Sequence, residues 1–282
     1  MSITTVGIIG AGTMGNGIAQ VCATSGIHVV MVDISEAAVA KGIATVASSL
    51  ERLIKKEKIS AADRDAALAR IKGSTSYDDL KASQLKDTAA TENHDLKVKI
   101  LKQIDAIVPA DVIIASNTSS ISITKLAAVT SRPERFIGMH FFNPVAMMAL
   151  VEIIRGLQTS DATHEAVQTM AKALGKTPIT VKNAPGFVVN RILVPMINEA
   201  FFVLSEGTAT AEDIDEGMKL GCNHPIGPLA LTDLIGLDTM LAVMEMFYAG
   251  FNDPKYRPAP LLKEMVDAGY LGRKSGQGFY SY

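Results

Sequence analysis

The segment Thr4–Gln20 constrains the fold of this chain more than any other. It reads TTVGIIGAGTMGNGIAQ, so an apolar β-branched run is followed at once by glycines with the spacing GxGxxG and then by a helical pattern. A second apolar run, HVVMVD, ends at Asp33, which lies 33 − 12 = 21 residues after the middle glycine. A bare GxGxxG is weak evidence, but a strand, glycines, a helix and a second strand ending in an acid predict a dinucleotide site.

Each glycine of this motif has a distinct physical role. Gly10 permits the tight turn, Gly12 lets the backbone approach a pyrophosphate, and Gly15 allows the helix to pack closely on the strand. The free N–H groups and positive dipole at the start of the helix then favour phosphate. We therefore expect the cofactor to bind at Gly10, Gly12, Thr13, Met14 and Gly15.

Asp33 identifies the kind of nucleotide. Its carboxylate suits the ribose hydroxyls of the adenosine, and it would repel a 2′-phosphate. Ile34 and Ser35 supply no arginine to bind such a phosphate, so NAD is favoured over NADP. Two alternatives remain open for the motif by itself, which are a glycine-rich turn without a ligand and a flavin site.

The periodicity of the chain changes near residue 183. Up to that point, short apolar runs alternate with helical patterns, which is typical of an α/β, Rossmann-type, doubly wound and mostly parallel sheet. Pro185 and Gly186 then interrupt the pattern, and the remainder has only helical periodicity. We expect an NAD-binding domain over 1–183 and an all-helical domain over 184–282.

Composition narrows the class of partner. The 282 residues carry a net charge of −2, so no general attraction draws the protein to nucleic acid or to an anionic membrane. The two cysteines form no CxxC pair and no zinc spacing, and the N-terminus lacks a basic leader with a cleavage site. We expect a cytoplasmic protein with a small-molecule partner and no metal.

Polar side chains follow two further predicted strands. IIASNTSSI places Asn117 and Ser119 after one strand, and GMHFFNPV places His140 and Asn143 after the next. In an open α/β sheet, ligands bind beyond the carboxyl ends of the strands. Taken singly, Ser119 could cap a helix and His140 could be a core histidine. Glu152, inside the apolar run ALVEII, is harder to dismiss because a buried carboxylate needs a partner.

Together these side chains suit the oxidation of an alcohol to a ketone. A histidine such as His140 can take the hydroxyl proton, since an ordinary imidazole titrates near neutrality. A carboxylate behind the ring, such as Glu152, would fix its tautomer and stabilise the imidazolium. Serine and asparagine can donate to the substrate oxygen when it gains negative charge in the reverse direction.

A long ordered series of motifs extends this interpretation. GIIGAGTMGNGIA, ATEN, SNTSS, GMHFFNPV, LVEII, PGFVVNRIL, LGCNHPIGPLALTDLIGLD and GYLGRKSGQGFYSY cover nearly the full length. On these motifs the chain resembles the short-chain, two-domain L-3-hydroxyacyl-CoA dehydrogenases, and especially the bacterial 3-hydroxybutyryl-CoA dehydrogenases. The resemblance implies His140 as general acid/base, Glu152 as its orienting partner, and a homodimer built through the C-terminal helices.

The resemblance also implies roles for residues outside that pair. It implies that Ser119, Asn143 and Asn190 surround the substrate carbonyl, with Asn190 supplied by the second domain, and that Glu92 and Lys97 line the cofactor side together with Ser119 and Asn143. It further implies that Ser49, Arg52 and Lys56 meet the phosphates of an acyl-CoA. From the residues alone, another reading is favoured, in which cations at a helix C-terminus complement its dipole and face water; the resemblance reverses that preference.

Two segments depart from the family pattern. Ala146 and Met147 stand where the family usually has Pro and Val, which should free the loop after Asn143. The larger departure is LKDTAATEN, where Lys86 and Asp87 replace an apolar pair. Neighbouring residues on a strand point to opposite faces, so these two ions could not pair within a covered sheet. We expect a shortened strand at 88–91, with both charges displaced toward solvent or the segment locally irregular.

Three functional hypotheses follow for the whole chain. The first is an NAD-dependent dehydrogenase of (S)-3-hydroxyacyl-CoA, with 3-hydroxybutyryl-CoA as the expected substrate. The second is a dehydrogenase of another small 3-hydroxy acid. The third is a non-catalytic NAD-binding protein in which the altered strand has spoiled the nicotinamide side.

Overall fold

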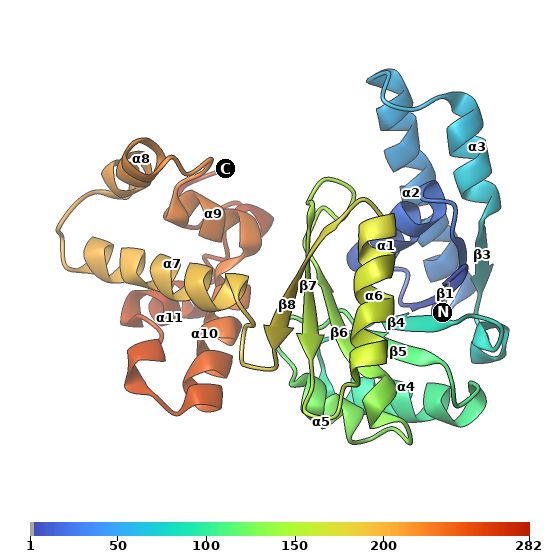
Figure 1. The fold of residues 1–282 in the computed structure, drawn as a ribbon. Helices are drawn as coiled ribbons and strands as arrows, with labels where there is room; N and C mark the ends of the chain where they lie inside the picture. Colours follow the sequence, from blue (N-terminus) through green and yellow to red (C-terminus); the bar gives the residue numbers. More distant parts are fainter. Residues whose placement is uncertain (1–2) are drawn as a thin grey trace. The chain divides into compact units, whose positions relative to one another are not determined.

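The computed structural model describes residues 3–282, which form two compact units on either side of the Ala184–Pro185 bond. The first unit is built on one eight-stranded sheet in the order β3-β2-β1-β4-β5-β6-β7-β8 (Figure 1). Every neighbouring pair is parallel except β6 and β7, which run antiparallel. The second unit is helical. The prediction of a Rossmann-type sheet followed by a helical domain is confirmed.

The strands of the first unit are β1 (Thr5–Ile9), β2 (His28–Val32), β3 (Ile71–Ser74), β4 (Leu85–Thr88), β5 (Ile113–Ser116), β6 (Phe136–Phe141), β7 (Leu150–Arg155) and β8 (Thr177–Lys182). Its α-helices are α1 (Thr13–Thr24), α2 (Glu36–Lys55), α3 (Ala61–Ala69), α4 (His94–Ile107), α5 (Ile123–Ala127) and α6 (Asp161–Ala173). The edge strand β3 and helix α3 carry weak sequence signals, because the four residues IKGS of β3 include a glycine and a lysine and bury little.

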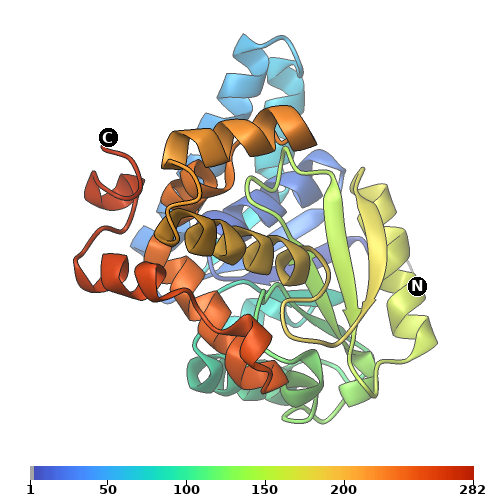
Figure 2. The ribbon, with the colours of Figure 1, turned by 90° about the vertical axis from the view of Figure 1, so that its left-hand side faces the viewer.

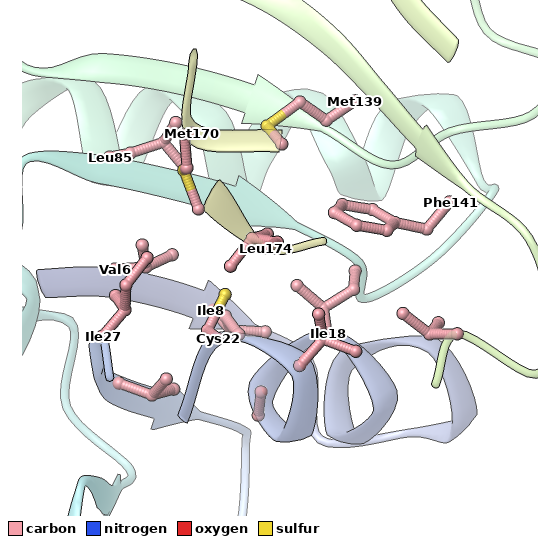
Figure 3. Packing of buried hydrophobic residues seen from close by; sticks show 14 of the residues in the cluster. Val6, Ile8, Ile18, Cys22, Ile27, Leu85, Met139, Phe141, Met170 and Leu174 are labelled. Atoms are coloured by element: carbon pink, nitrogen blue, oxygen red, sulfur yellow. The ribbon is translucent and has the colours of Figure 1, made fainter. Parts of the chain in front are cut away.

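The two faces of the sheet have different coverings. One core joins α1, α2 and α6 to alternate residues of β1, β4, β6 and β7, and Figure 3 shows Ile8, Cys22, Met139 and Met170 converging there. The intervening strand residues point the other way, toward α4 and α5. For example, a Cβ on Gly138 would meet Ile123 of α5 at 2.9 Å. This second face carries the polar side chains that follow in the site.

The prediction for the fourth strand is wrong. β4 spans Leu85–Thr88, and it is paired in regular register with β1 on one side and β5 on the other. Lys86 is 0% exposed and Asp87 is 1% exposed, so neither side chain has moved to solvent. Backbone hydrogen bonds to β1 and β5 fix the strand. Its register then determines that Lys86 points to one face of the sheet and Asp87 to the other.

The surroundings of the two charges differ. Gly7 lies opposite Lys86 in β1, and Lys86 Nζ donates to the carbonyl oxygen of Ser83. Asp87 shares a face with Ile8 and points into the core under α1, α2 and α6 instead, and neither of its carboxylate oxygens has a hydrogen-bond partner of normal geometry within residues 3–282. Burial raises the pKa of Asp87 to about 7, which the charge of Lys97 and the Thr88 amide offset only in part. Burial likewise lowers the pKa of Lys86 to about 8.

The second unit contains α7 (Val189–Ser205), α8 (Ala211–Cys222), α9 (Pro228–Ile235), α10 (Leu237–Phe251) and α11 (Pro260–Asp267), drawn from orange to red in Figures 1 and 2. Its core includes Phe201 and Phe247. Asp233 of α9 holds the C-terminal segment by accepting from the amides of Phe279 and Tyr280, each at 2.9 Å. Within residues 3–282, no single helix is long and apolar enough to span a membrane; α9 and α10 reach the required length and composition only when taken together, across a bend of 99°.

Candidate active site

The glycine loop is shaped as its sequence predicts. Gly10 has φ +102°, and a Cβ there would lie 2.6 Å from the Cα of Ala90. A Cβ on Gly15 would lie 1.7 Å from the carbonyl oxygen of Gly10, which shows how closely α1 packs on the turn. Gly12, the N-cap of α1, has nothing within 4 Å of the corresponding position, and both it and Thr13 are exposed. The open helix N-terminus therefore fits a pyrophosphate.

Asp33, directly after β2, is bound to the same loop. Its Oδ2 accepts from the amide of Ala11 at 2.6 Å, and its Oδ1 accepts from the amide of Ile34 at 2.7 Å. The carboxylate is half-buried, so its remaining lone pairs are available to ribose hydroxyls. The residues present fit NAD, which has no 2′-phosphate.

Glu92 joins the loop after β4 to the loop after β5. Its carboxylate accepts from the Thr118 hydroxyl at 2.6 Å, from the Ser119 amide at 3.0 Å and from the Ser120 hydroxyl at 3.0 Å. Ser119 does not cap the next helix, because Ser122 is the N-cap of α5. Thr118 was not expected to take part. The consecutive hydroxyl residues Thr118, Ser119 and Ser120 after β5 could have predicted this contact, because short polar side chains commonly hydrogen-bond nearby backbone and loop groups.

Lys97 of α4 lies at the ends of the same two strands. Its Nζ donates to the carbonyl oxygen of Thr88 at 3.2 Å and to the Ser116 hydroxyl at 3.4 Å. The side chain is 2% exposed, and burial lowers the pKa of its ammonium while the carboxylates of Glu92 and Asp87 raise it. Lys97 therefore places a buried cation under the loops that carry Glu92 and Ser119.

His140 and Glu152 form a buried pair on the face covered by α5. They lie directly opposite each other where β6 and β7 run antiparallel, and His140 Nδ1 is 2.7 Å from Glu152 Oε2. His140 is 6% exposed and Glu152 is 0% exposed. Asn117, at the end of β5, accepts from the amide of Phe141 at 2.8 Å and so fixes the end of β6 to its neighbour.

The other expected site residues fall into three places. Asn143 is exposed and follows β6 by two residues, at the edge of the sheet where Ser119 follows β5. Ser49 and Arg52 lie on the last two turns of α2, and Lys56 is its C-cap; Arg52 donates to the Ser48 hydroxyl at 3.1 Å. Asn190 lies in the first turn of α7, in the second unit.

The first unit thus brings together the glycine loop with Asp33, Glu92 with Ser119, and His140 with Glu152.

This geometry can hold a proton on an imidazole backed by a carboxylate, at the edge of a sheet that also presents a dinucleotide loop. Parallel strands β1, β4, β5 and β6 all end at that edge. The arrangement is suited to moving a proton and a hydride between a small alcohol and a nicotinamide.

Comparison with known proteins agrees with the geometry. Residues 5–184 match the family model described as "3-hydroxyacyl-CoA dehydrogenase, NAD binding domain", and residues 186–282 match "3-hydroxyacyl-CoA dehydrogenase, C-terminal domain". Together the two models cover nearly the whole chain, so the first unit is an NAD-binding domain.

Relatives and solved structures agree with the family models. The chain is 50% identical over 280 residues to a 3-hydroxybutyryl-CoA dehydrogenase of Bradyrhizobium diazoefficiens, covering 99% of this chain and 96% of that protein. It is 77% identical to the (S)-3-hydroxybutyryl-CoA dehydrogenase of Ralstonia eutropha, with a TM-score of 0.98 over 100% of this chain and 99% of the other. A diketoreductase structure is 30% identical with a TM-score of 0.86, covering 100% of both chains. The chain therefore belongs to the 3-hydroxyacyl-CoA dehydrogenase family and is an NAD-dependent oxidoreductase.

Proposed function

We propose that the protein oxidises (S)-3-hydroxybutyryl-CoA to acetoacetyl-CoA with NAD, and catalyses the reverse reduction. The observation that carries the proposal is the His140–Glu152 pair, 2.7 Å apart at the edge of an NAD-binding sheet. The identity to 3-hydroxybutyryl-CoA dehydrogenases over nearly the full length supports the CoA ester as the substrate.

His140 is the general acid/base in this proposal. In the oxidative direction its Nε2 takes the proton of the substrate hydroxyl, while Glu152 holds Nδ1 and stabilises the imidazolium that results. Bound NAD would supply the acceptor for the hydride of the carbinol carbon. In the reductive direction His140 returns the proton, and Ser119 and Asn143 donate to the carbonyl oxygen as negative charge develops there.

Glu92 has a second task in this proposal. Because it accepts from the Ser119 amide and from two neighbouring hydroxyls, it fixes the position of Ser119 as well as lining the cofactor side. Lys97 supports the same loops from below. These contacts keep the donor groups oriented before the substrate binds, which lowers the reorganisation needed during the reaction.

The CoA moiety is assigned to α2. Ser49, Arg52 and Lys56 follow one another at intervals of three and four residues, so they lie along one side of the helix, and the two cations are exposed. They would bind phosphates of the CoA. We further propose that the protein is a cytoplasmic homodimer formed through the helices of the second unit, as the family resemblance implies.

A spectrophotometric assay tests the substrate assignment. The loss of NADH absorbance is measured with acetoacetyl-CoA and, in parallel, with free acetoacetate. Turnover of the CoA ester alone is the expected result. Turnover of the free acid at a similar kcat/KM would instead support a dehydrogenase of small 3-hydroxy acids, and NAD binding without either reaction would support a non-catalytic protein.

The diketoreductase similarity favours one second candidate. A protein of the same fold at 30% identity is described as acting on dicarbonyl compounds, so reduction of a 3-keto group without CoA is compatible with this scaffold. The variant Arg52→Ala discriminates the two functions. It should raise KM for acetoacetyl-CoA if Arg52 binds a CoA phosphate, and it should leave the reduction of a free diketone unchanged.

A further inference from the structure

Lys176, between α6 and β8, makes contacts that the site described above does not explain. Its Nζ donates to the carbonyl oxygen of Val145 at 2.5 Å and to that of Met148 at 2.8 Å. Both carbonyls belong to the segment that leads from Asn143, after β6, to the start of β7. Because β7 is antiparallel to β6 and parallel to β8, Lys176 lies at the same edge of the sheet as the end of β6.

The segment that Lys176 binds is also closed on itself. The carbonyl oxygen of Pro144 accepts from the amides of Met147 and Met148, at 2.9 and 3.0 Å, and Ala149 accepts from the amide of Thr177 at 2.8 Å. The segment therefore has defined backbone contacts although Ala146 and Met147 replace the Pro and Val that the family usually has there.

Val145 links this segment to the cofactor helix. Its side chain is 3% exposed, and a Cβ on Gly17 of α1 would lie 2.9 Å from it. Gly17 lies two residues after Gly15 of the glycine motif. A displacement of Val145 would therefore shift both Asn143 and α1, the helix whose N-terminus forms the dinucleotide site.

The chemistry of Lys176 is unusual for a surface-loop lysine. Its side chain is 9% exposed, and within residues 3–282 no carboxylate pairs with its ammonium. Burial lowers the pKa of this ammonium. A buried cation is costly unless its donors are used, and both identified partners are carbonyls of the Asn143 segment.

We propose that Lys176 is a positioning residue of the dehydrogenase, which acts by holding the segment 143–149 and thereby setting where the Asn143 side chain lies relative to His140. This inference rests on the proposed function, in which Asn143 donates to the substrate oxygen. Lys176 itself exchanges no proton with substrate.

The first test compares Lys176→Met with Lys172→Met, a matched change of an exposed lysine on α6. The loss of two charge-assisted hydrogen bonds should lower kcat/KM for acetoacetyl-CoA by about 10- to 100-fold. Lys172→Met should stay within about twofold of the wild type. The dependence of kcat on pH should keep its shape in Lys176→Met, because the proton-transfer group is intact. A wild-type kcat/KM in Lys176→Met would overturn the proposal.

A double-mutant cycle then separates positioning from general stabilisation. If Lys176 acts through Asn143, adding Lys176→Met to Asn143→Ala should cost less than about twofold more, since interacting residues are not additive. Losses that multiply fully would show that Lys176 does not act through Asn143. Should Lys176→Met not fold, Lys176→Gln keeps a shorter, neutral donor and carries the same cycle.

Hydrogen exchange gives a readout that does not depend on activity. In Lys176→Met the amides of Met147 and Met148 should exchange about tenfold or more faster, while those of β6 and β7 remain protected. Unchanged exchange at both amides would contradict the tether. If the wild type fails to reduce acetoacetyl-CoA, the proposed function fails, and the exchange comparison still decides whether Lys176 holds the segment.

Discussion

Strand β4 and the strand pair β6–β7 both place ionisable side chains inside a covered sheet, with opposite results. Glu152 faces His140 across the antiparallel pair at 2.7 Å, whereas Asp87 faces only Ile8 and Ala115 in the neighbouring strands. Residues opposite each other on adjacent strands share a face, but consecutive residues on one strand do not. Charges can therefore neutralise each other across strands, and Lys86 and Asp87 cannot do so along β4.

The largest effect is expected from His140→Ala. Loss of a general acid/base should lower kcat by about 10³- to 10⁴-fold, while the Kd for NADH stays nearly constant because the glycine loop is untouched. Stopped assays of acetoacetyl-CoA reduction and fluorescence titration of NADH measure the two quantities. His164→Ala, which alters a histidine bound to Thr180 outside the site, is the control. A nearly unchanged kcat in His140→Ala would contradict the assignment of its role.

The next largest effect is an increase in the stability of the protein. Replacing the isolated carboxylate by a similar apolar side chain in Asp87→Val should raise the free energy of unfolding by about 3 to 4 kcal/mol at pH 8. Denaturant unfolding measures the gain, with Asp267→Val, an exposed position, as a control expected to change stability by less than about 0.5 kcal/mol. A loss of stability in Asp87→Val would mean that this carboxylate has a stabilising partner.

The dependence on pH provides a separate check of Asp87. A carboxyl whose pKa is raised to about 7 in the folded state binds more protons than the unfolded chain between the ordinary value and 7. The stability of the wild type relative to Asp87→Val should therefore fall as pH rises from about 4 to about 7, and then level off. Unfolding measured at pH 5, 6, 7 and 8 gives this difference. A difference that does not change with pH would show that Asp87 is not desolvated.

Removing the carboxylate charge in the paired region should instead destabilise the protein. Glu152→Gln removes the charge that faces His140, and we expect it to lower the free energy of unfolding by about 2 kcal/mol, together with a decrease in kcat. Thermal unfolding followed by circular dichroism measures the stability, and the NADH assay measures kcat. A Glu152→Gln enzyme more stable than the wild type would show that the carboxylate in β6–β7 is no better accommodated than the one in β4.

The smallest effect is expected at Lys86. Because its ammonium has the Ser83 carbonyl as a partner, Lys86→Met should stabilise the protein by only about 1 kcal/mol at pH 7. The pKa of Lys86 is lowered to about 8, so the unfolded chain binds more protons above that pH, and the wild type should regain this stability as pH rises from about 8 to about 10. Denaturant unfolding at pH 7 and pH 10 measures the difference in free energy of unfolding between Lys86→Met and the wild type. A larger difference at pH 10 than at pH 7 would contradict the expected role of the Lys86 charge.

The sequence predicts best the elements in which local pattern and tertiary role agree. The glycine motif, the strand ending at Asp33 and the His140–Glu152 pair were all foreseeable, since each joins a periodic apolar run to a polar residue at a telling position. β4 was not, because its side chains favour solvent while its neighbours β1 and β5 require it as a central strand. The shared clamp of Glu92 on Thr118, Ser119 and Ser120 was also missed, since contacts between two loops are set by tertiary structure.

The close approach of Gly10 to Ala90 explains why β4 keeps a register that suits its side chains so poorly. Ala89 donates its amide to the Ile9 carbonyl at 2.8 Å, and the Cα of Ala90 occupies the space where Gly10 would carry a side chain. A slip of one residue, about 3.3 Å, would move Asp87 to the other face of the sheet, and it would also drive this backbone into the turn that receives the pyrophosphate. The position of β4 is thus dictated by the cofactor loop beside it, and substitutions at 86 and 87 can change the stability of the enzyme without changing where the strand lies.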